Sequence, residues 1–215
     1  MITISQAVET TVLKKPFLAE AVSEGIINLS ALARQIQPDV EKMLHKEVNF
    51  QAIVVALNRM APVFEISFSR KLEKMSKDIG EIVLRSNLAD FTFLNSAALV
   101  KKQMKLWGKV SKRDDVFYTV SRGVFETTFV VSNSLSDILL NIFEEETLIS
   151  HLENLSSVTI KLPPDNGKQP GLYYSLLKKI AWNGVSIIEV VSTTNEFSII
   201  IDEKNVGAVF QALTT

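Results

Sequence analysis

The sequence contains no cysteine, which removes several classes of chemistry at once. Without thiols there is no disulfide framework, no thiolate metal site and no cysteine nucleophile. Only two histidines are present, His45 and His151, so a histidine-rich metal site is also excluded. Each histidine stands alone, and neither supports a catalytic role.

The chain also lacks a charge excess and any long hydrophobic run. Its 23 Lys and Arg residues nearly balance 24 Asp and Glu residues, so no overall field attracts nucleic acid or an anionic membrane. No stretch approaches the roughly 18 uninterrupted apolar residues of a transmembrane helix. The start of the chain lacks the basic and apolar regions of a signal peptide. We therefore expect a cytoplasmic protein without a membrane partner.

What the sequence does contain first is a helical pattern. Over residues 1–62, apolar side chains recur at the three- and four-residue spacing of short helices. Asn28 or Ser30 is suited to cap one helix, and Pro38 fits the first turn of the next. We expect a compact helical domain here, followed by a connecting helix over residues 63–79.

Beyond residue 80, runs typical of strands alternate with helical runs, and the same order occurs twice. The matching segments, 70 positions apart, are Val116–Ser121 with Ser186–Val191, Glu126–Val131 with Glu196–Ile201, and Leu135–Phe143 with Asn205–Leu213. Upstream the offset grows: Trp107 matches Trp182 at 75 positions and Glu81–Leu84 matches Ser157–Ile160 at 76.

This repeat predicts two modules, residues 80–156 and 157–215, each in the order strand, helix, strand, strand, helix. That βαββα order is ferredoxin-like, with helices on one face of an antiparallel sheet, so the predicted fold class is α+β. We expect Trp107 and Trp182 to be core anchors between helix and sheet. The run Glu144–Glu146 is expected to be a solvated loop.

The second module resembles an ACT domain, the small regulatory module in the C-terminal half of aspartate kinases. The resemblance rests on a loop ending in Gln169-Pro170-Gly171, a helix leading to Trp182-Asn183-Gly184, and the hairpin of Glu189–Thr193 and Glu196–Ile201. The first module matches through the repeat, with Asn95-Ser96 in place of the Pro-Gly turn. The chain has no room for the kinase domain, so it resembles the regulatory half alone.

The resemblance implies ligand binding rather than catalysis, with an amino acid held near the loop between the first strand and the first helix. Unpaired N–H groups at a helix start suit a carboxylate, and a glycine allows close approach. Asp165 is expected near the ammonium, while Asn166 or Gln169 could select a side chain. The predicted ligand-binding residues are Asp165, Asn166, Gln169, Gly171, Leu172, Ser192 and Thr193. Turn formation alone also accounts for such residues.

A second hypothesis concerns the N-terminal helices. The run Leu29–Ile36, a turn at Gln37-Pro38 and the helices that follow resemble a helix-turn-helix, in which Gln51, Asn58 and Arg59 could reach base edges. Against DNA binding, residues 1–62 hold six basic and six acidic side chains, whereas DNA-binding domains usually show a basic footprint.

No nucleophile–base pair, phosphate loop or metal spacing is present, so no catalytic residue, metal ligand or cofactor is predicted. We expect a non-catalytic regulatory or sensor protein that binds an amino acid or similar small metabolite. A homodimer is also expected, because paired ACT sheets leave edges that another chain can cover. The alternatives are a ligand-responsive DNA-binding transcription regulator and a structural subunit that docks on a metabolic enzyme.

Overall fold

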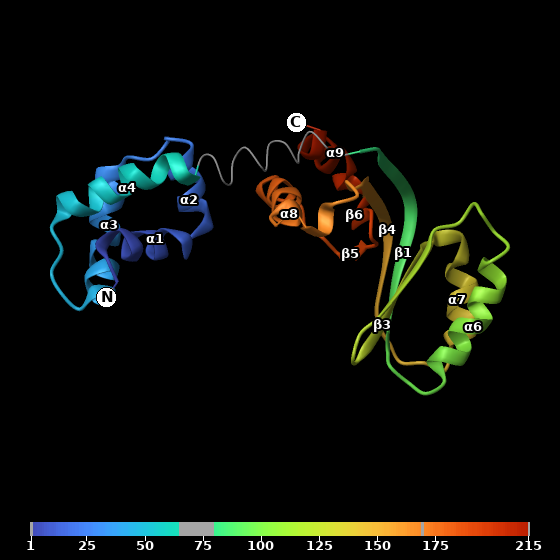
Figure 1. The fold of residues 1–215 in the computed structure, drawn as a ribbon. Coiled ribbons are helices and arrows are strands. Elements are labelled where there is room, and N and C mark those ends of the chain that lie inside the picture. Colours follow the sequence, from blue (N-terminus) through green and yellow to red (C-terminus); the bar gives the residue numbers. More distant parts are fainter. Residues whose placement is uncertain (1, 65–79, 169, 215) are drawn as a thin grey trace. The chain divides into compact units, whose positions relative to one another are not determined.

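A computed structural model describes residues 2–64, 80–168 and 170–214, which belong to two compact units (Figure 1). The N-terminal unit spans Met1–Lys77 and the C-terminal unit spans Asp78–Thr215. Most of the connecting helix predicted over 63–79 lies outside the described residues. None of the described helices is both long and apolar enough to cross a membrane.

The N-terminal unit packs its helices around one apolar core. They are α1 (Ile4–Leu13), α2 (Pro16–Ser23), α3 (Leu29–Leu44) and α4 (Phe50–Phe64). The predicted cap at Asn28 is confirmed, because its side chain accepts hydrogen bonds from the Ser30 and Ala31 N–H groups. The buried core includes Val8, Leu32 and Leu57.

The predicted turn at Gln37-Pro38 is wrong, because α3 continues through Pro38 as one 16-residue helix. Proline removes one backbone donor, which leaves the carbonyl four residues earlier without its helical partner. That residue, Arg34, is exposed, so water can reach the region. The helix ends instead at His45, whose left-handed φ of 53° closes the last turn.

The C-terminal unit is built on an antiparallel sheet with helices, as the α+β prediction requires. The sheet order is β2-β3-β1-β4-β6-β5. The elements in chain order are β1 (Ile82–Leu94), α6 (Leu99–Val110), β2 (Tyr118–Arg122), β3 (Glu126–Ser132), α7 (Ser136–Phe143), β4 (Leu148–Lys161), α8 (Leu172–Trp182), β5 (Glu189–Ser192), β6 (Glu196–Asp202) and α9 (Val206–Thr214). Short 3₁₀ turns cover Asn133–Leu135, Asn166–Lys168 and Glu203–Asn205.

The expected equivalence of Glu81–Leu84 and Ser157–Ile160 is wrong. These segments are neighbours in the sheet, with Ile82 paired to Ile160 and Leu84 to Val158. The equivalent strand positions are Leu88 and Leu155, 67 residues apart, which pair with Ser132 of β3 and Asp202 of β6. The boundary expected between residues 156 and 157 therefore falls inside β4.

The long strands β1 and β4 cross from one half of the sheet to the other. The first half of the sheet consists of β2, β3, the end of β1 and the start of β4, paired in that order. The second half consists of β5, β6, the end of β4 and the start of β1, paired in that order. The fourth strand of the second half thus comes from residues that precede the first half. Asn87 and Asn154, also 67 residues apart, take left-handed φ values of 58° and 56°. They lie where the register of the pairing between β1 and β4 shifts.

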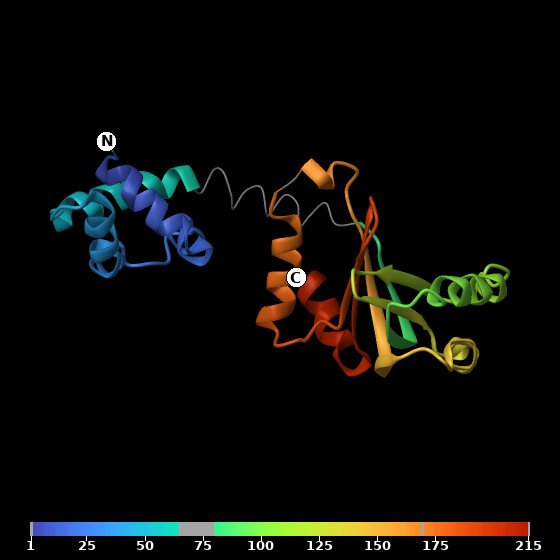
Figure 2. The same cartoon turned by 90° about the horizontal axis from the view of Figure 1, so that it is seen from below.

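Each half is covered by its own helices. The first half buries Phe91, Phe93 and Phe129 against α6 and α7. In the second half, α8 buries Leu172, Leu176 and Ile180. In both views the strands lie between the α6–α7 pair and the α8–α9 pair (Figures 1 and 2). A smaller apolar cluster joins the halves: Leu88, Val130, Leu155 and Ile200, with Phe117 and Ile188 packed against it.

The two tryptophans are not core anchors, contrary to expectation. Trp107 is 54% exposed and Trp182 is 81% exposed. The residue beside Trp107, Leu106, and the one two positions before Trp182, Ile180, fill the core instead. The helical spacing identified the correct turn of each helix but not the correct side.

Asp90 is the buried charged group beside this joint. Its strand neighbours Ala89 and Phe91 face the α6–α7 core, so alternation places Asp90 on the opposite face, with Leu88. It is 3% exposed, and one carboxyl oxygen, Oδ2, has no hydrogen-bond partner. Burial, and secondarily Glu189, raise the pKa of Asp90 to about 6. Ser157, 67 residues later, holds the equivalent position and is also buried without a partner.

Replacing Asp90 with asparagine should stabilise the protein at neutral pH. The folded protein holds the Asp90 proton more tightly than the unfolded chain, so wild-type stability falls as pH rises from 3.8 to about 6 and stays lower above it. Asp90→Asn should raise the free energy of unfolding by about 1 kcal/mol at pH 7.5, after allowance for solvent screening, and by little near pH 4. Thermal unfolding at three pH values measures this, with exposed Glu153→Gln as control. Parallel pH profiles for wild type and Asp90→Asn would contradict the assignment.

Candidate functional site

The loop between β4 and α8 forms one wall of a pocket of about 360 Å³, and the turn between β5 and β6 forms the other. The pocket is lined by Pro164, Asp165, Asn166, Gly167, Lys168, Thr193 and Thr194. Of the predicted ligand-binding residues, Asp165, Asn166 and Thr193 therefore come together. The sequence distance between them is bridged by the sheet, which places the hairpin turn beside the loop.

Asn166 holds the two walls together. Its side chain is buried, and Nδ2 donates to the carbonyl of Pro163 at 2.9 Å and to that of Thr194 at 2.6 Å. Both donor hydrogens are used within the protein. The amide therefore fixes the pocket's shape, and only its oxygen is left for the predicted selection of a ligand side chain.

The other predicted residues lie beside the pocket rather than in it. Gly171 starts α8 with a left-handed φ of 95° and no side-chain cap, and Leu172 is buried, so only its backbone could meet a ligand. The Ser192 hydroxyl lies 3.1 Å from the Tyr173 hydroxyl and donates to the Glu196 carbonyl at 3.2 Å. Gln169 lies outside the described residues.

Lys168 and Thr194 line the pocket but were absent from the predicted set. Lys168 places a cation in the same pocket as the Asp165 carboxylate, and both side chains belong to exposed residues. Their three-residue spacing in a turn-rich loop was the available signal. It is weak, because opposite charges in solvated loops are common.

The first half contains the same tie between loop and hairpin. Asn95 Nδ2 donates to the carbonyls of Gly123 and Val124 at 3.0 and 3.1 Å, and the Thr127 hydroxyl donates to Asn95 Oδ1 at 2.6 Å. Asn95 therefore links the loop to the hairpin turn in the first half, as Asn166 does in the second. The sequence comparison that set it against Pro170 was wrong in register.

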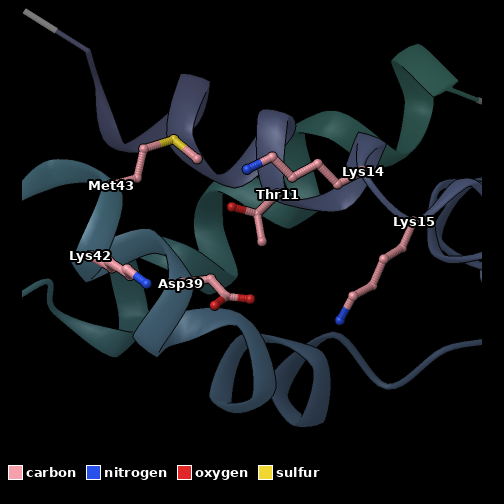
Figure 3. A pocket seen from close by; sticks show the side chains of 6 residues that line it. All are labelled: Thr11, Lys14, Lys15, Asp39, Lys42 and Met43. Atoms are coloured by element: carbon pink, nitrogen blue, oxygen red, sulfur yellow. The ribbon is translucent and has the colours of Figure 1, made fainter.

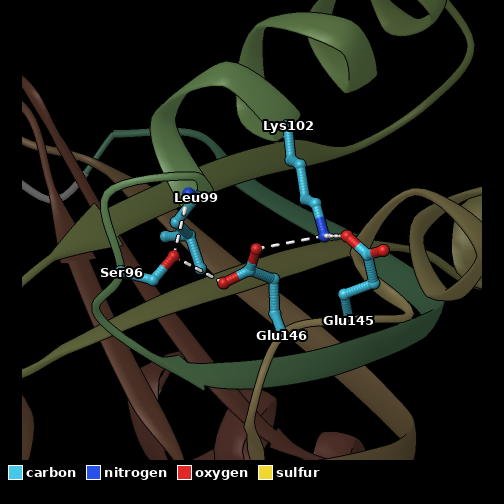
Figure 4. A network of polar contacts seen from close by, with 5 residues as sticks. All are labelled: Ser96, Leu99, Lys102, Glu145 and Glu146. Atoms are coloured by element: carbon cyan, nitrogen blue, oxygen red, sulfur yellow. Dashed lines mark hydrogen bonds and ion pairs between the residues drawn. The ribbon is translucent and has the colours of Figure 1, made fainter.

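Next to this tie, side chains of the protein occupy the start of α6 (Figure 4). The Ser96 hydroxyl accepts from the Leu99 N–H at 3.0 Å and donates to Glu146 Oε2 at 2.6 Å. Lys102 pairs with Glu146 at 3.1 Å and with Glu145 at 3.3 Å. The Glu146 side chain is only 5% exposed, so the expectation of a solvated Glu144–Glu146 loop is wrong for this residue.

The network sets the charge state of Glu146. The Ser96 hydroxyl first, and Lys102 second, hold the pKa of Glu146 below its ordinary value. A carboxylate therefore stands where a ligand's carboxylate would have to bind in this half. In the second half the described pocket-lining residues include one carboxylate, Asp165, and one cation, Lys168.

We predict that Glu146→Gln destabilises the protein by about 1–2 kcal/mol at pH 7, because it removes the charged partner of Ser96 and Lys102. The lowered pKa means that this stabilisation is present above pH 4.5 and is lost as the pH falls below it. Chemical denaturation at pH 7 and pH 3.5 measures the difference. The matched control is Glu145→Gln, whose side chain is 88% exposed and which should cost under about 0.5 kcal/mol. Equal effects of the two substitutions would refute the role given to Glu146.

The residues proposed to reach DNA, Gln51, Asn58 and Arg59, are all exposed residues of α4. Gln51 and Arg59 line a pocket of about 480 Å³ together with Ile4, Ser5 and Asn49. Asn58 instead donates its side-chain amide to the Val54 carbonyl of its own helix at 3.0 Å. The turn predicted at Gln37-Pro38 for a helix-turn-helix is absent, because α3 continues through it, and DNA binding by these residues stays a prediction. Among the described residues, no group of three or more His, Asp or Glu side chains could hold a metal ion.

No protein-family model matches this sequence, and no curated protein matches it. Solved structures do match its fold. The regulatory subunit of aspartate kinase from Thermus thermophilus, in its ligand-free form, is 14% identical, with a TM-score of 0.52, covering 63% of this chain and 96% of that one. The corresponding subunit from Thermus flavus is 14% identical, with a TM-score of 0.51 and the same coverage.

The aspartate kinase of Synechocystis matches at 15% identity and a TM-score of 0.52, over 64% of this chain but only 26% of the kinase. The predicted resemblance to the regulatory half of aspartate kinases is therefore confirmed at the level of fold. The matched regulatory subunits are spanned almost completely, whereas most of the whole kinase has no counterpart in the match.

Proposed function

We propose that this chain is a non-catalytic regulatory protein that binds an amino acid, or a similar small metabolite, through its C-terminal unit. The observation that supports the proposal is the fold, which the unit shares with two structures described as regulatory subunits of aspartate kinase. The pocket between the β4–α8 loop and the β5–β6 turn is the site we assign to the ligand.

The C-terminal unit is, in this proposal, a pair of ACT-like modules that exchange strands. Each half of the sheet has the four-strand order of a ferredoxin-like module, and each is covered by two helices. The start of β1 completes the second module and the start of β4 completes the first. Each module is thus completed by a strand that is continuous with the other module, so the two share backbone as well as side-chain contacts.

The charges of the pocket suit a zwitterion. Asp165 can accept hydrogen bonds from an α-ammonium group, and Lys168 can donate to an α-carboxylate. The uncapped start of α8 at Gly171 offers a second position for the carboxylate. In the first module Ser96 and Glu146 occupy the corresponding position, which favours the second module as the binding module.

A thermal-shift screen of the full chain against the twenty amino acids tests this function. A ligand at a hundred times its dissociation constant should stabilise the protein by about 2.7 kcal/mol. Asp165→Asn and Lys168→Gln should each weaken that ligand about tenfold, or 1.4 kcal/mol, when measured by calorimetry. Asp114→Asn and Lys109→Gln, exposed residues away from the pocket, are the matched controls.

If Asp165→Asn weakens binding and Lys168→Gln does not, the carboxylate lies at the start of α8 instead. Unchanged affinity in both variants would remove the ligand from this pocket. Gly171→Val cannot serve as a test, because a β-branched residue at φ 95° strains the backbone and alters the fold itself.

We further propose that a second copy of this chain covers the outer face of α6. Val100, Met104 and Trp107, spaced four and three residues apart, are 46%, 70% and 54% exposed and lie on one stripe of the helix. The Trp107 ring lies 5.5 Å from that of Tyr118 in β2, so the stripe borders the edge strand of the sheet. An uncovered edge beside an apolar stripe matches the same feature of a copy related by a two-fold axis.

Met104→Glu should shift the protein from dimer to monomer, because a carboxylate would be buried at the centre of that contact. Sedimentation equilibrium at micromolar concentration measures the change. Lys105→Glu, on the same helix but off the stripe, is the control and should leave the dimer intact. A wild-type monomer, or a dimer unaffected by Met104→Glu, would contradict this interface.

A further inference from the structure

The N-terminal unit contains a pocket of about 450 Å³ between α1, the turn into α2, and α3 (Figure 3). It is lined by Thr11, Lys14, Lys15, Asp39, Lys42 and Met43. In the view of Figure 3 the ammonium groups of Lys42 and Lys15 lie on either side of the Asp39 carboxylate, and that of Lys14 lies beside Thr11. The volume falls within the range of about 300–1,000 Å³ common for small-molecule sites.

The two uncharged residues that line the pocket, Thr11 and Met43, already make contacts within the protein. The Thr11 hydroxyl donates to the Ala7 carbonyl at 2.8 Å, and Met43 packs against the core of the unit. The chemistry of the pocket is therefore that of its charged side chains. None of the ion pairs or hydrogen bonds found between described residues involves the side chains of Lys14, Lys15, Asp39 or Lys42.

Three ammonium groups and one carboxylate leave an excess of positive charge in this pocket, although residues 1–62 together carry no net charge. Residues 1–62 contain six Lys and Arg side chains, and half of them line this single pocket. One carboxylate offsets only one of the three ammonium charges, and a concave surface with a net positive charge attracts an anion. Lysine is a common phosphate-binding residue because its ammonium acts as a compact point charge.

We propose that this pocket binds a small phosphate-bearing metabolite that also carries hydroxyl groups. A phosphate monoester at neutral pH has about two negative charges, which matches the local excess. Asp39, an acceptor at the centre of the lysines, meets a hydroxyl group of the same molecule. Lys15 and Lys42 hold the phosphate oxygens from opposite walls.

The distribution of charge favours a small ligand over a nucleic-acid backbone. A duplex is held by phosphate contacts spread along a basic surface, and its affinity grows with their number. Here the other three basic residues of 1–62 lie outside the pocket: Arg34 lies over the Phe50 ring at 5.6 Å from its centroid, Arg59 lines a different pocket, and Lys46 does not line this one. The positive footprint is confined to one concave site.

Isothermal titration calorimetry of the full chain with ADP, inorganic pyrophosphate and adenosine tests the proposal at low salt. ADP and pyrophosphate should bind and adenosine should not. Lys15→Gln and Lys42→Gln should each weaken ADP about tenfold. The matched control is Lys46→Gln, an exposed lysine just beyond α3 that does not line the pocket, and it should leave affinity unchanged.

Asp39→Ala separates the two functions of the site. It should weaken ADP, which loses the acceptor for its hydroxyl groups, and strengthen pyrophosphate, which loses only a repelling charge. Stabilisation of the C-terminal unit by amino acids should be the same in all these variants, so this test stands apart from the function proposed above. A thermal melt of each variant checks that it is folded.

Three results would overturn the proposal. The first is no measurable ADP or pyrophosphate binding at millimolar concentration. The second is binding that Lys15→Gln and Lys42→Gln leave unchanged. The third is tight binding of duplex DNA that the same substitutions abolish and that ADP does not displace, which would make the pocket part of a nucleic-acid surface.

Discussion

The antiparallel pairing of β1 with β4 is the constraint on which the C-terminal unit depends. Both strands run through both halves of the sheet, so each half is completed by a strand continuous with the other. Side chains alternate along a strand, and a slip of one residue would turn every apolar group to the wrong face. Asn87 and Asn154, which have left-handed φ values, lie at the positions where the register between the two strands shifts. The small apolar cluster around Leu88 and Leu155 then holds the halves together.

The pairing of β1 with β4 also determines where the loops lie. The two halves of the sheet differ mainly in these loops. In each half an asparagine, Asn95 or Asn166, ties the loop before a helix to the carbonyls of a hairpin turn. The first half then fills the space at the helix start with Ser96 and Glu146. The second leaves a pocket open between Asp165 and Lys168. The space between the helix start and the hairpin turn is thus filled by side chains in the first half and open as a pocket in the second. Such differences are common in loops carried by a rigid sheet.

The same divergence reaches the buried face. Asp90 and Ser157 occupy equivalent positions, but one is a carboxyl whose burial makes ionisation costly and the other a hydroxyl. Near these positions both halves contain a hydrogen bond between two hydroxyl groups on neighbouring strands. It joins Thr92 to Thr128 at 2.9 Å in the first half and Thr159 to Ser198 at 2.8 Å in the second. Burial raises the pKa of the carboxyl at Asp90, whereas the serine at the equivalent position has no carboxyl group to ionise.

The sequence by itself determined what depends on local pattern. Helical spacing and caps such as Asn28 located the N-terminal helices, and the 70-residue repeat predicted the order of elements from β2 onward. The loop that holds Asp165 and Asn166 also followed from turn chemistry and the resemblance to ACT domains. Only the tertiary structure decided what depends on partners distant in the chain. The pairing of β1 with β4, the exposure of Trp107 and Trp182 and the burial of Glu146 are set by groups tens of residues away. Periodicity reports which face of an element is apolar, but it contains no information about what that face will meet.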